Sequence, residues 1–155
     1  RDSLNIPRVE AKELIDGYFA TYPQVREYMD RSIAVAREKG YVETLFGRKR
    51  MLPDIHSANS VVRGYAERNA INAPIQGGAA DIIKIAMVRI FDRIEAEGLR
   101  TRMILQVHDE LNFNVPAEEL EQVSRLVTEE MENACRLKVP LLADSGSGKN
   151  WLEAH

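Results

Sequence analysis

The sequence predicts an α+β fold in which antiparallel strands are covered by helices on one side. Residues 103–115 alternate apolar and polar side chains, with Met103, Leu105 and Val107 expected on one face, and this period is typical of half-buried strands. Residues 82–94 carry apolar side chains around much of a helical circumference, which indicates a deeply packed helix. No internal repeat or low-complexity segment interrupts these patterns.

Two helices are expected in the first forty residues. Pro7 fits the first turn of a helix, because its ring presets a helical backbone angle, and apolar residues then recur at helical spacing as far as Tyr22. A second apolar stripe follows Pro23 and ends at Gly40, a residue typical of helix C-termini.

A short hairpin is expected next, with strands over 41–45 and 48–52 that turn on Phe46 and Gly47. Basic side chains of its second strand, together with one later arginine, are candidate contacts to phosphate groups: Arg48, Lys49, Arg50 and Arg63. Such contacts fix position without reading a base sequence. A solvated basic turn is the alternative for each of them.

The middle of the chain predicts two helices separated by a proline. Ser57 is expected to cap a helix that runs into the early seventies, where Pro74 should interrupt it because proline has no backbone N–H. The second helix should run over about 76–97 and end at Gly98. The glycine pair at 77–78 lacks the Lys-Ser/Thr of a phosphate-binding loop, so close helix packing is the better explanation.

The C-terminal third predicts one more helix and one more strand. A helix should begin at about Ala117 and place Val123 and Val127 on one apolar face. Residues 140–143 are expected to form a last short strand, followed by a Gly/Ser loop. Trp151 is expected to anchor the C-terminal end.

Composition indicates one ordinary globular unit, because 155 residues that are 45% hydrophobic are enough to bury a core. No apolar run approaches the roughly 18 residues of a membrane span, so no membrane contact is expected. The single cysteine, Cys135, cannot form an internal disulfide, and no signal peptide is visible, so a cytoplasmic location is expected. The chain opens on Arg1, which agrees with a piece of a longer protein.

Charge is unevenly distributed, although the net charge of −3 by itself argues against a nucleic-acid binder. Between Arg37 and Arg68 there are seven basic residues and four acidic ones. Between Asp109 and Asn133 there are eight acidic residues and one basic residue. This asymmetry hints at a phosphate-facing region and a separate acidic surface.

Two adjacent carboxylates, Asp109 and Glu110, lie between the strands predicted within 103–115. A tight hairpin favours Asn-Gly or Asp-Gly at its turn, and two like charges are poor turn residues. Carboxylate oxygens are hard ligands that suit magnesium, so the pair indicates a cation site. The alternative is a solvated acidic turn beside a polar histidine.

Arg68, Asn72 and Gln76 are four residues apart, so on an unbroken helix they share one polar stripe. Side chains of these types donate hydrogen bonds to the acceptors that every base pair presents in the DNA minor groove. A solvent-facing helix side is the alternative. A kink at Pro74 would rotate Gln76 away from the other two.

Four segments of the chain resemble sequence motifs of the A family of DNA polymerases, in matching order. Residues 106–110 (QVHDE) are similar to the family's third motif, and residues 67–81 are similar to the segment that leads into its long palm helix. Residues 40–50 resemble its fingers-to-palm hairpin, and residues 146–155 resemble its C-terminal end. Together these segments extend over nearly the whole chain.

The resemblance implies an antiparallel palm-type sheet with packed helices, part of a larger right-hand polymerase fold that performs template-directed DNA synthesis in replication and repair. It implies two Mg²⁺ ions, primer-template DNA and dNTP as partners of the complete enzyme. Asp109 corresponds to the second catalytic aspartate and metal ligand, and Glu110 to a supporting acid. His108 corresponds to a residue near the primer end. The polar stripe corresponds to contacts with the nascent duplex, made by Arg68, Asn72 and Gln76.

The family's first catalytic aspartate and its nucleotide-gripping helix have no counterpart here. The chain is therefore expected to be a single unit, 1–155, holding the end of the fingers and most of the palm, without the upstream palm strand, the thumb or most of the fingers. Alone it should be inactive, and the alternative function is a non-catalytic duplex-DNA-binding module. A small metal-dependent hydrolase built on His108, Asp109 and Glu110 is disfavoured, because ligands on three adjacent residues do not converge on one ion. The oligomeric state stays open, since a sheet that lacks a strand exposes an edge.

Overall fold

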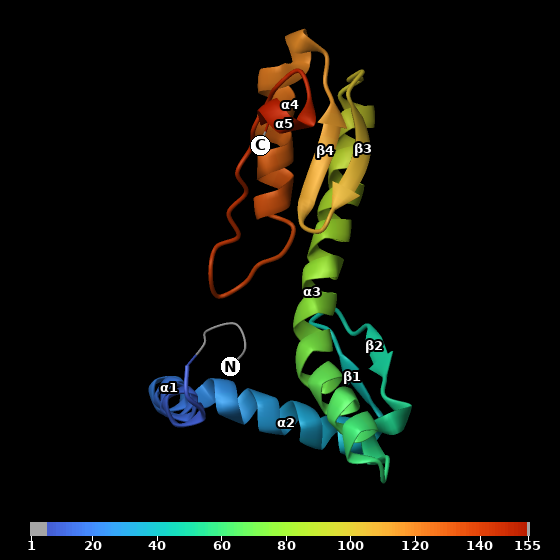
Figure 1. Cartoon of the computed structure of the whole chain (residues 1–155). Coiled ribbons are helices and arrows are strands. Elements are labelled where there is room, and N and C mark those ends of the chain that lie inside the picture. Colours follow the sequence, from blue (N-terminus) through green and yellow to red (C-terminus); the bar gives the residue numbers. More distant parts are fainter. Residues whose placement is uncertain (1–5, 155) are drawn as a thin grey trace. The chain divides into compact units, whose positions relative to one another are not determined.

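The structure is a computed structural model that describes residues 6–154. The chain forms two compact units, the first ending at Gly77 and the second beginning at Gly78, and Figure 1 shows the elements of each. One long helix, α3 (Ser60–Ala96), contributes its first half to one unit and its second half to the other. No helix within residues 6–154 is long and apolar enough to cross a membrane.

The first unit contains two helices, a hairpin and the first half of α3, as the sequence predicts. Its elements are α1 (Arg8–Thr21), α2 (Pro23–Lys39), β1 (Tyr41–Glu43), β2 (Lys49–Met51) and the short 3-10 helix η1 (Pro53–His56). Gly40 ends α2 with a left-handed φ of 76°, which glycine adopts without a steric penalty. The strands β1 and β2 pair antiparallel, with Val42 opposite Arg50.

The core of the first unit is small and rich in alanine. Its buried residues come from α2, the hairpin region, η1 and α3: Ala36, Val42, Leu52, Ile55, Ala66 and Ala70. In contrast, α1 has no buried residue, and its apolar side chains Leu14, Ile15 and Tyr18 are at least half exposed. Much of the apolar stripe that predicts α1 is therefore exposed among residues 6–154.

The predicted break at Pro74 is wrong, because α3 runs through it as one helix of 37 residues. A proline inside a helix removes one hydrogen bond and crowds the carbonyls of the preceding turn, at a cost of about 3 kcal/mol. Here the Tyr28 hydroxyl donates to the Ile71 carbonyl at 2.9 Å, which supplies a donor in that turn. Ala70 and Ala73 also pack in the core on either side of Ile71. Tertiary contacts thus outweigh the local preference.

The start of α3 also differs from the prediction. Asn59, not Ser57, is the cap: its side-chain oxygen accepts the backbone N–H groups of Val61 at 2.9 Å and Val62 at 3.4 Å. Ser57 lies outside the helix and its hydroxyl accepts the N–H of Asn59 at 3.3 Å.

Gly77 allows the hairpin to approach α3 closely, as expected for the glycine pair. A Cβ at position 77 would lie 2.6 Å from the Thr44 methyl carbon. Thr44 cannot rotate freely, because its hydroxyl oxygen accepts the N–H groups of Phe46 at 3.3 Å and Arg48 at 3.2 Å. Gly78 differs, since nothing lies within 4 Å of a Cβ built there.

The second unit packs the last half of α3 and α4 (Leu120–Glu132) against the hairpin of β3 (Arg102–Val107) and β4 (Glu110–Asn114), with η2 (Ala117–Glu119) and α5 (Trp151–Ala154) at its edges. The core is larger here and includes buried residues of α3, of α4 and of the segment that follows α4: Ala86, Ile90, Ile94, Leu126 and Ala134. Met103, Leu111 and Phe113 of the hairpin pack against it. The antiparallel hairpin with packed helices confirms the predicted α+β class.

A buried carboxylate joins the start of β3 to η2. Glu119 accepts the backbone N–H of Arg100 at 2.9 Å, and the N–H and hydroxyl of the buried Thr101 at 3.0 and 2.7 Å. These hydrogen bonds, that of Arg100 first, stabilise the ionised form and hold the pKa of Glu119 below its ordinary value. Arg93 links α3 to α4 through Glu129 at 2.8 Å and Glu130 at 3.1 Å.

The predicted strand at 140–143 is wrong, because residues 133–150 contain no strand. The segment instead lies along α4 and is held by side chains: Ala143 donates its N–H to Glu132 at 3.2 Å, and the Ser145 hydroxyl lies 3.0 Å from that of Ser124. No neighbouring strand offers it a ladder of backbone partners within the described residues.

We predict that Gly77→Ala lowers the free energy of unfolding. Overpacking costs about 1–3 kcal/mol, while the better helix propensity of alanine returns about 1 kcal/mol. The double variant Thr44→Ser/Gly77→Ala removes only the obstructing methyl and should regain wild-type stability, measured by urea denaturation. Gly78→Ala is the matched control and should not destabilise. Equal stability of the two alanine variants would contradict the close approach.

Candidate active site and DNA-binding surface

The β3–β4 hairpin turns on two residues, His108 and Asp109, because Val107 pairs with Glu110. The two acids were expected to share the turn; instead Glu110 is the first residue of β4. His108 takes a φ of 55° and is the only non-glycine residue from 6 to 154 with a positive φ. A positive φ at the first of two turn residues matches the hairpin geometry that glycine usually occupies. The Gln106 amide supports this backbone by donating to the His108 carbonyl at 2.9 Å.

A β-bulge changes which side chains share a face of this hairpin. Met103 pairs with Phe113 and Leu105 pairs with Asn112, so Ile104 is an extra residue on β3. Residues after the bulge change face, and Leu105 is 48% exposed. The expectation that Met103, Leu105 and Val107 share one face is therefore wrong. His108 lies in the turn between the two strands.

Asp109 is exposed at the tip of this hairpin. Within residues 6–154 its carboxylate has neither a hydrogen bond nor an ion pair. An exposed carboxylate without a protein partner is available as an oxygen ligand for a divalent cation.

Glu110 is held in place by the C-terminal segment. It is half-buried, and its Oε1 accepts the indole N–H of Trp151 at 2.7 Å. This contact confirms that Trp151 anchors the C-terminal end. Two residues further along β4, the side-chain nitrogen of Asn112 is buried without a hydrogen-bond partner among the described residues. The face of β4 that carries Glu110 therefore holds one fixed carboxylate and one unused donor.

The hairpin tip by itself is an incomplete metal site. Within residues 6–154 no group of three or more His, Cys, Asp or Glu side chains could hold a metal ion. Asp109 fits the role of one ligand, and a magnesium-type ion commonly takes one or two carboxylates together with substrate phosphates. The described residues therefore do not supply a set of three such side chains around Asp109.

The polar stripe lies on the first unit. Arg68, Asn72 and Gln76 are all exposed on α3. Because α3 is not broken at Pro74, the three side chains keep their spacing of about one helical turn each. A helix break therefore does not separate Gln76 from the other two residues of the stripe. Arg68 extends along the helix, where its Nη1 would lie 3.6 Å from a Cβ at Gly64.

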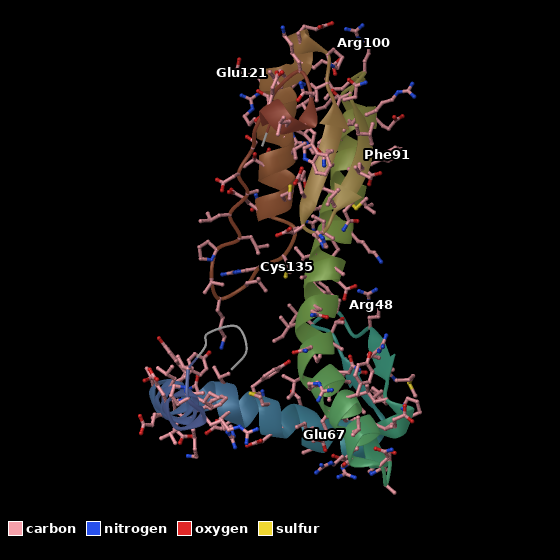
Figure 2. The ribbon with its side chains drawn as sticks, viewed as in Figure 1. Arg48, Glu67, Phe91, Arg100, Glu121 and Cys135 are labelled. Atoms are coloured by element: carbon pink, nitrogen blue, oxygen red, sulfur yellow. The ribbon has the colours of Figure 1, made fainter. Side chains whose placement is uncertain are left out.

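The basic residues of the hairpin differ in how firmly they are held. Arg48 lies where the hairpin meets α3 and donates to the Gly77 carbonyl at 3.1 Å (Figure 2). Lys49 lies 4.5 Å above the Tyr41 ring and 3.9 Å from the Glu43 carboxylate. Arg50 is exposed and has no ion pair with any described residue. Of these cations, Arg50 is the most available to a phosphate.

Arg63 serves a local structural role. Its guanidinium donates to the Ser57 carbonyl at 2.8 Å and lies 3.9 Å from the Glu67 carboxylate. These contacts fix the loop that precedes α3. Arg37 approaches the same glutamate at 2.6 Å, so Glu67 (Figure 2) neutralises two of the cations counted in the basic segment.

The model of DNA polymerase family A matches residues 1–153. The chain belongs to DNA polymerase family A. It is 53% identical over 153 residues to DNA polymerase I of Streptococcus pneumoniae, and 53% identical over 152 residues to DNA polymerase I of Geobacillus stearothermophilus. These alignments cover 99% and 98% of the chain but 17% of each relative, so the chain spans about a sixth of their length.

A solved structure has the same fold as this family A chain. The POL domain of Pol1 from M. smegmatis, solved in complex with DNA primer-template and dNTP, is 46% identical and superposes with a TM-score of 0.95. The match covers 99% of this chain and 27% of the other. The predicted family and the predicted palm-type architecture are therefore confirmed.

Sequence reasoning missed the bond between Trp151 and Glu110. The two residues are 41 positions apart, and no periodicity links them. The position of Trp151 after a Gly/Ser-rich segment indicates an anchor for the C-terminal end, but it does not predict which residue the tryptophan contacts.

Proposed function

We propose that the full-length protein is a DNA-directed DNA polymerase that transfers nucleotides from dNTP to a primer 3′-hydroxyl in DNA replication and repair. The observation that carries this proposal is the exposed Asp109 carboxylate at a hairpin tip of a family A chain. The M. smegmatis structure supports primer-template DNA and dNTP as partners, since that relative binds both. Cys135 is a free thiol, which supports a reducing, cytoplasmic location.

We propose that residues 1–155 supply the end of the fingers and most of the palm of this enzyme. The bare apolar side chains of α1, among them Leu14, Ile15 and Tyr18, support this assignment, because a larger polymerase region would cover them. The upstream palm strand, the thumb and the remaining fingers would lie elsewhere in the protein.

We propose that Asp109 is a ligand of two Mg²⁺ ions, with Glu110 as a supporting acid. When bound, such ions activate the 3′-hydroxyl and neutralise the triphosphate and leaving group. Asp109 would contribute a negative charge at the hairpin tip, where the tight turn leaves its carboxylate exposed. Glu110 contributes a second negative charge beside it, in an orientation fixed by Trp151.

We propose that the polar stripe of Arg68, Asn72 and Gln76 contacts the minor groove of the nascent duplex. Acceptors common to all base pairs lie there, so these donors can test the shape of a pair without reading its identity. His108 is proposed to lie near the primer end. Phosphate contacts are proposed for the basic side chains Arg48, Lys49, Arg50 and Arg63.

For the isolated chain, duplex binding without catalysis is the second candidate function. It is favoured because the described residues expose the polar stripe but hold no complete set of metal ligands. Binding of duplex DNA by the isolated chain without primer extension would support this candidate.

We predict that Asp109→Asn in the full-length protein leaves DNA affinity within a few-fold but slows the chemical step by several orders of magnitude. The charge on the ions is needed mainly in the transition state. Single-turnover primer extension measures this rate, and Asp92→Asn, an exposed site on α3, is the matched control. A loss below about tenfold, near 1.4 kcal/mol, would show that Asp109 is not a metal ligand.

We predict different effects for two residues of the stripe. Arg68→Ala should weaken primer-template binding more than Gln76→Ala, because hydrogen bonds from a charged donor are worth about 1.5–3 kcal/mol against about 1 kcal/mol for a neutral one. Gln76→Ala should chiefly change extension from mispaired primers, in which the minor-groove acceptors are displaced. Matched and mismatched primers measure both effects.

Arg50→Ala is the control for these stripe variants. As a phosphate contact it should lower affinity for all sequences alike and reduce the salt dependence of binding. If both stripe variants extend both primers like the wild type, Arg68 and Gln76 face water and the minor-groove assignment is wrong.

A further inference from the structure

The indole of Trp151 makes a directed contact to the residue that follows Asp109. Its N–H donates to Glu110 Oε1 at 2.7 Å, while the residue remains 49% exposed. The hydrogen bond gives this half-exposed tryptophan a specific partner on β4. A bond from a neutral N–H to a carboxylate is charge-assisted and restricts the rotamers of both side chains.

The short helix that carries Trp151 is fixed by its own polar groups. The Asn150 side-chain oxygen accepts the N–H of Glu153 at 3.1 Å, and the Asn150 amide donates to Glu153 Oε1 at 2.8 Å. The second oxygen of Glu153 accepts the N–H of Lys149 at 3.1 Å. These reciprocal bonds hold the backbone on both sides of Trp151.

Two glycines let the preceding loop wrap closely around this helix. A Cβ at Gly146 would overlap the Ala154 carbonyl, and a Cβ at Gly148 would lie 2.6 Å from the Cβ of Glu153. The bonds of Ala143 and Ser145 to α4 attach the same segment to the rest of the unit. Residues 143–154 therefore form a braced segment, here called the C-terminal brace.

We propose that Trp151 is a positioning residue for Glu110, so that the C-terminal brace sets the orientation of the second carboxylate at the hairpin tip. This inference rests on the proposed function of Asp109. Glu110 directly follows Asp109 and pairs with Val107, so a rotation of the Glu110 side chain moves a negative charge close to the tip. Without the indole N–H, the Glu110 side chain gains rotamers, and the geometry at the ion position becomes less uniform.

The test uses the full-length protein and the variant Trp151→Phe, which keeps an aromatic ring but removes the donor. Single-turnover extension should slow by about tenfold, and the Mg²⁺ concentration for half-maximal rate should rise several-fold, while DNA affinity stays unchanged. Leu152→Ala is the matched control, because Leu152 lies on the same helix and is 89% exposed. It should behave like the wild type.

A double-variant cycle separates positioning from general stability. If Trp151 acts through Glu110, Trp151→Phe/Glu110→Ala should be no slower than Glu110→Ala alone. Rate losses that multiply would show that Trp151 acts elsewhere and would overturn the proposal. Gly148→Ala is a second test, because it disturbs the C-terminal brace and leaves both Trp151 and Glu110 in place. It should raise the Mg²⁺ concentration for half-maximal rate as Trp151→Phe does.

A readout without metal or DNA completes the test. In metal-free protein, amide hydrogen exchange over residues 106–112 should be faster in Trp151→Phe than in Leu152→Ala. Unchanged exchange together with an unchanged Mg²⁺ requirement would overturn the positioning role, provided that Asp109→Asn is inactive. If Asp109→Asn keeps the wild-type rate, the proposed function of the hairpin fails instead.

Discussion

The long helix α3 supplies buried residues to the hydrophobic cores of both units. Its first half places Ala66 and Ala70 in one core, and its second half places Ile90 and Ile94 in the other. The continuity of α3 keeps the polar stripe in register through Pro74. A helix this long accepts an interior proline because the surrounding turn is packed with alanine and because the Tyr28 hydroxyl donates to a carbonyl there.

Packing contacts surround Pro74, but the β3–β4 hairpin tip is both strained in its backbone and exposed. His108 adopts a backbone angle that non-glycine residues rarely take, and Asp109 is left without a protein partner in the described chain. The unbroken pairing of Leu105–Val107 with Glu110–Asn112 and the Trp151–Glu110 bond hold this arrangement. Such a tip is suited to presenting one carboxylate to a ligand that the rest of the protein helps to bind.

Sequence patterns predicted those elements that depend on residues close together in the chain. Gly40 ends α2 as expected, and helical periodicity found both halves of α3. The failures involve contacts between distant residues: Pro74 is tolerated through Tyr28, and residues 140–143 lack a partner strand. The bulge at Ile104 was not predictable, because an apolar residue there fits either face of the hairpin. Residue type and spacing indicated the candidate site residues, motif resemblance gave them their expected roles, and their arrangement required the structure.

In the proposed function, Asp109 binds a divalent metal ion in the full-length protein. Replacing Mg²⁺ by Fe²⁺ in the protein bound to primer-template, with ascorbate and peroxide present, generates hydroxyl radicals that cleave the backbone next to the bound ion. Cleavage should concentrate at residues 107–110 and should disappear in excess Mg²⁺. Cleavage elsewhere in the protein with none in this hairpin would contradict the claim.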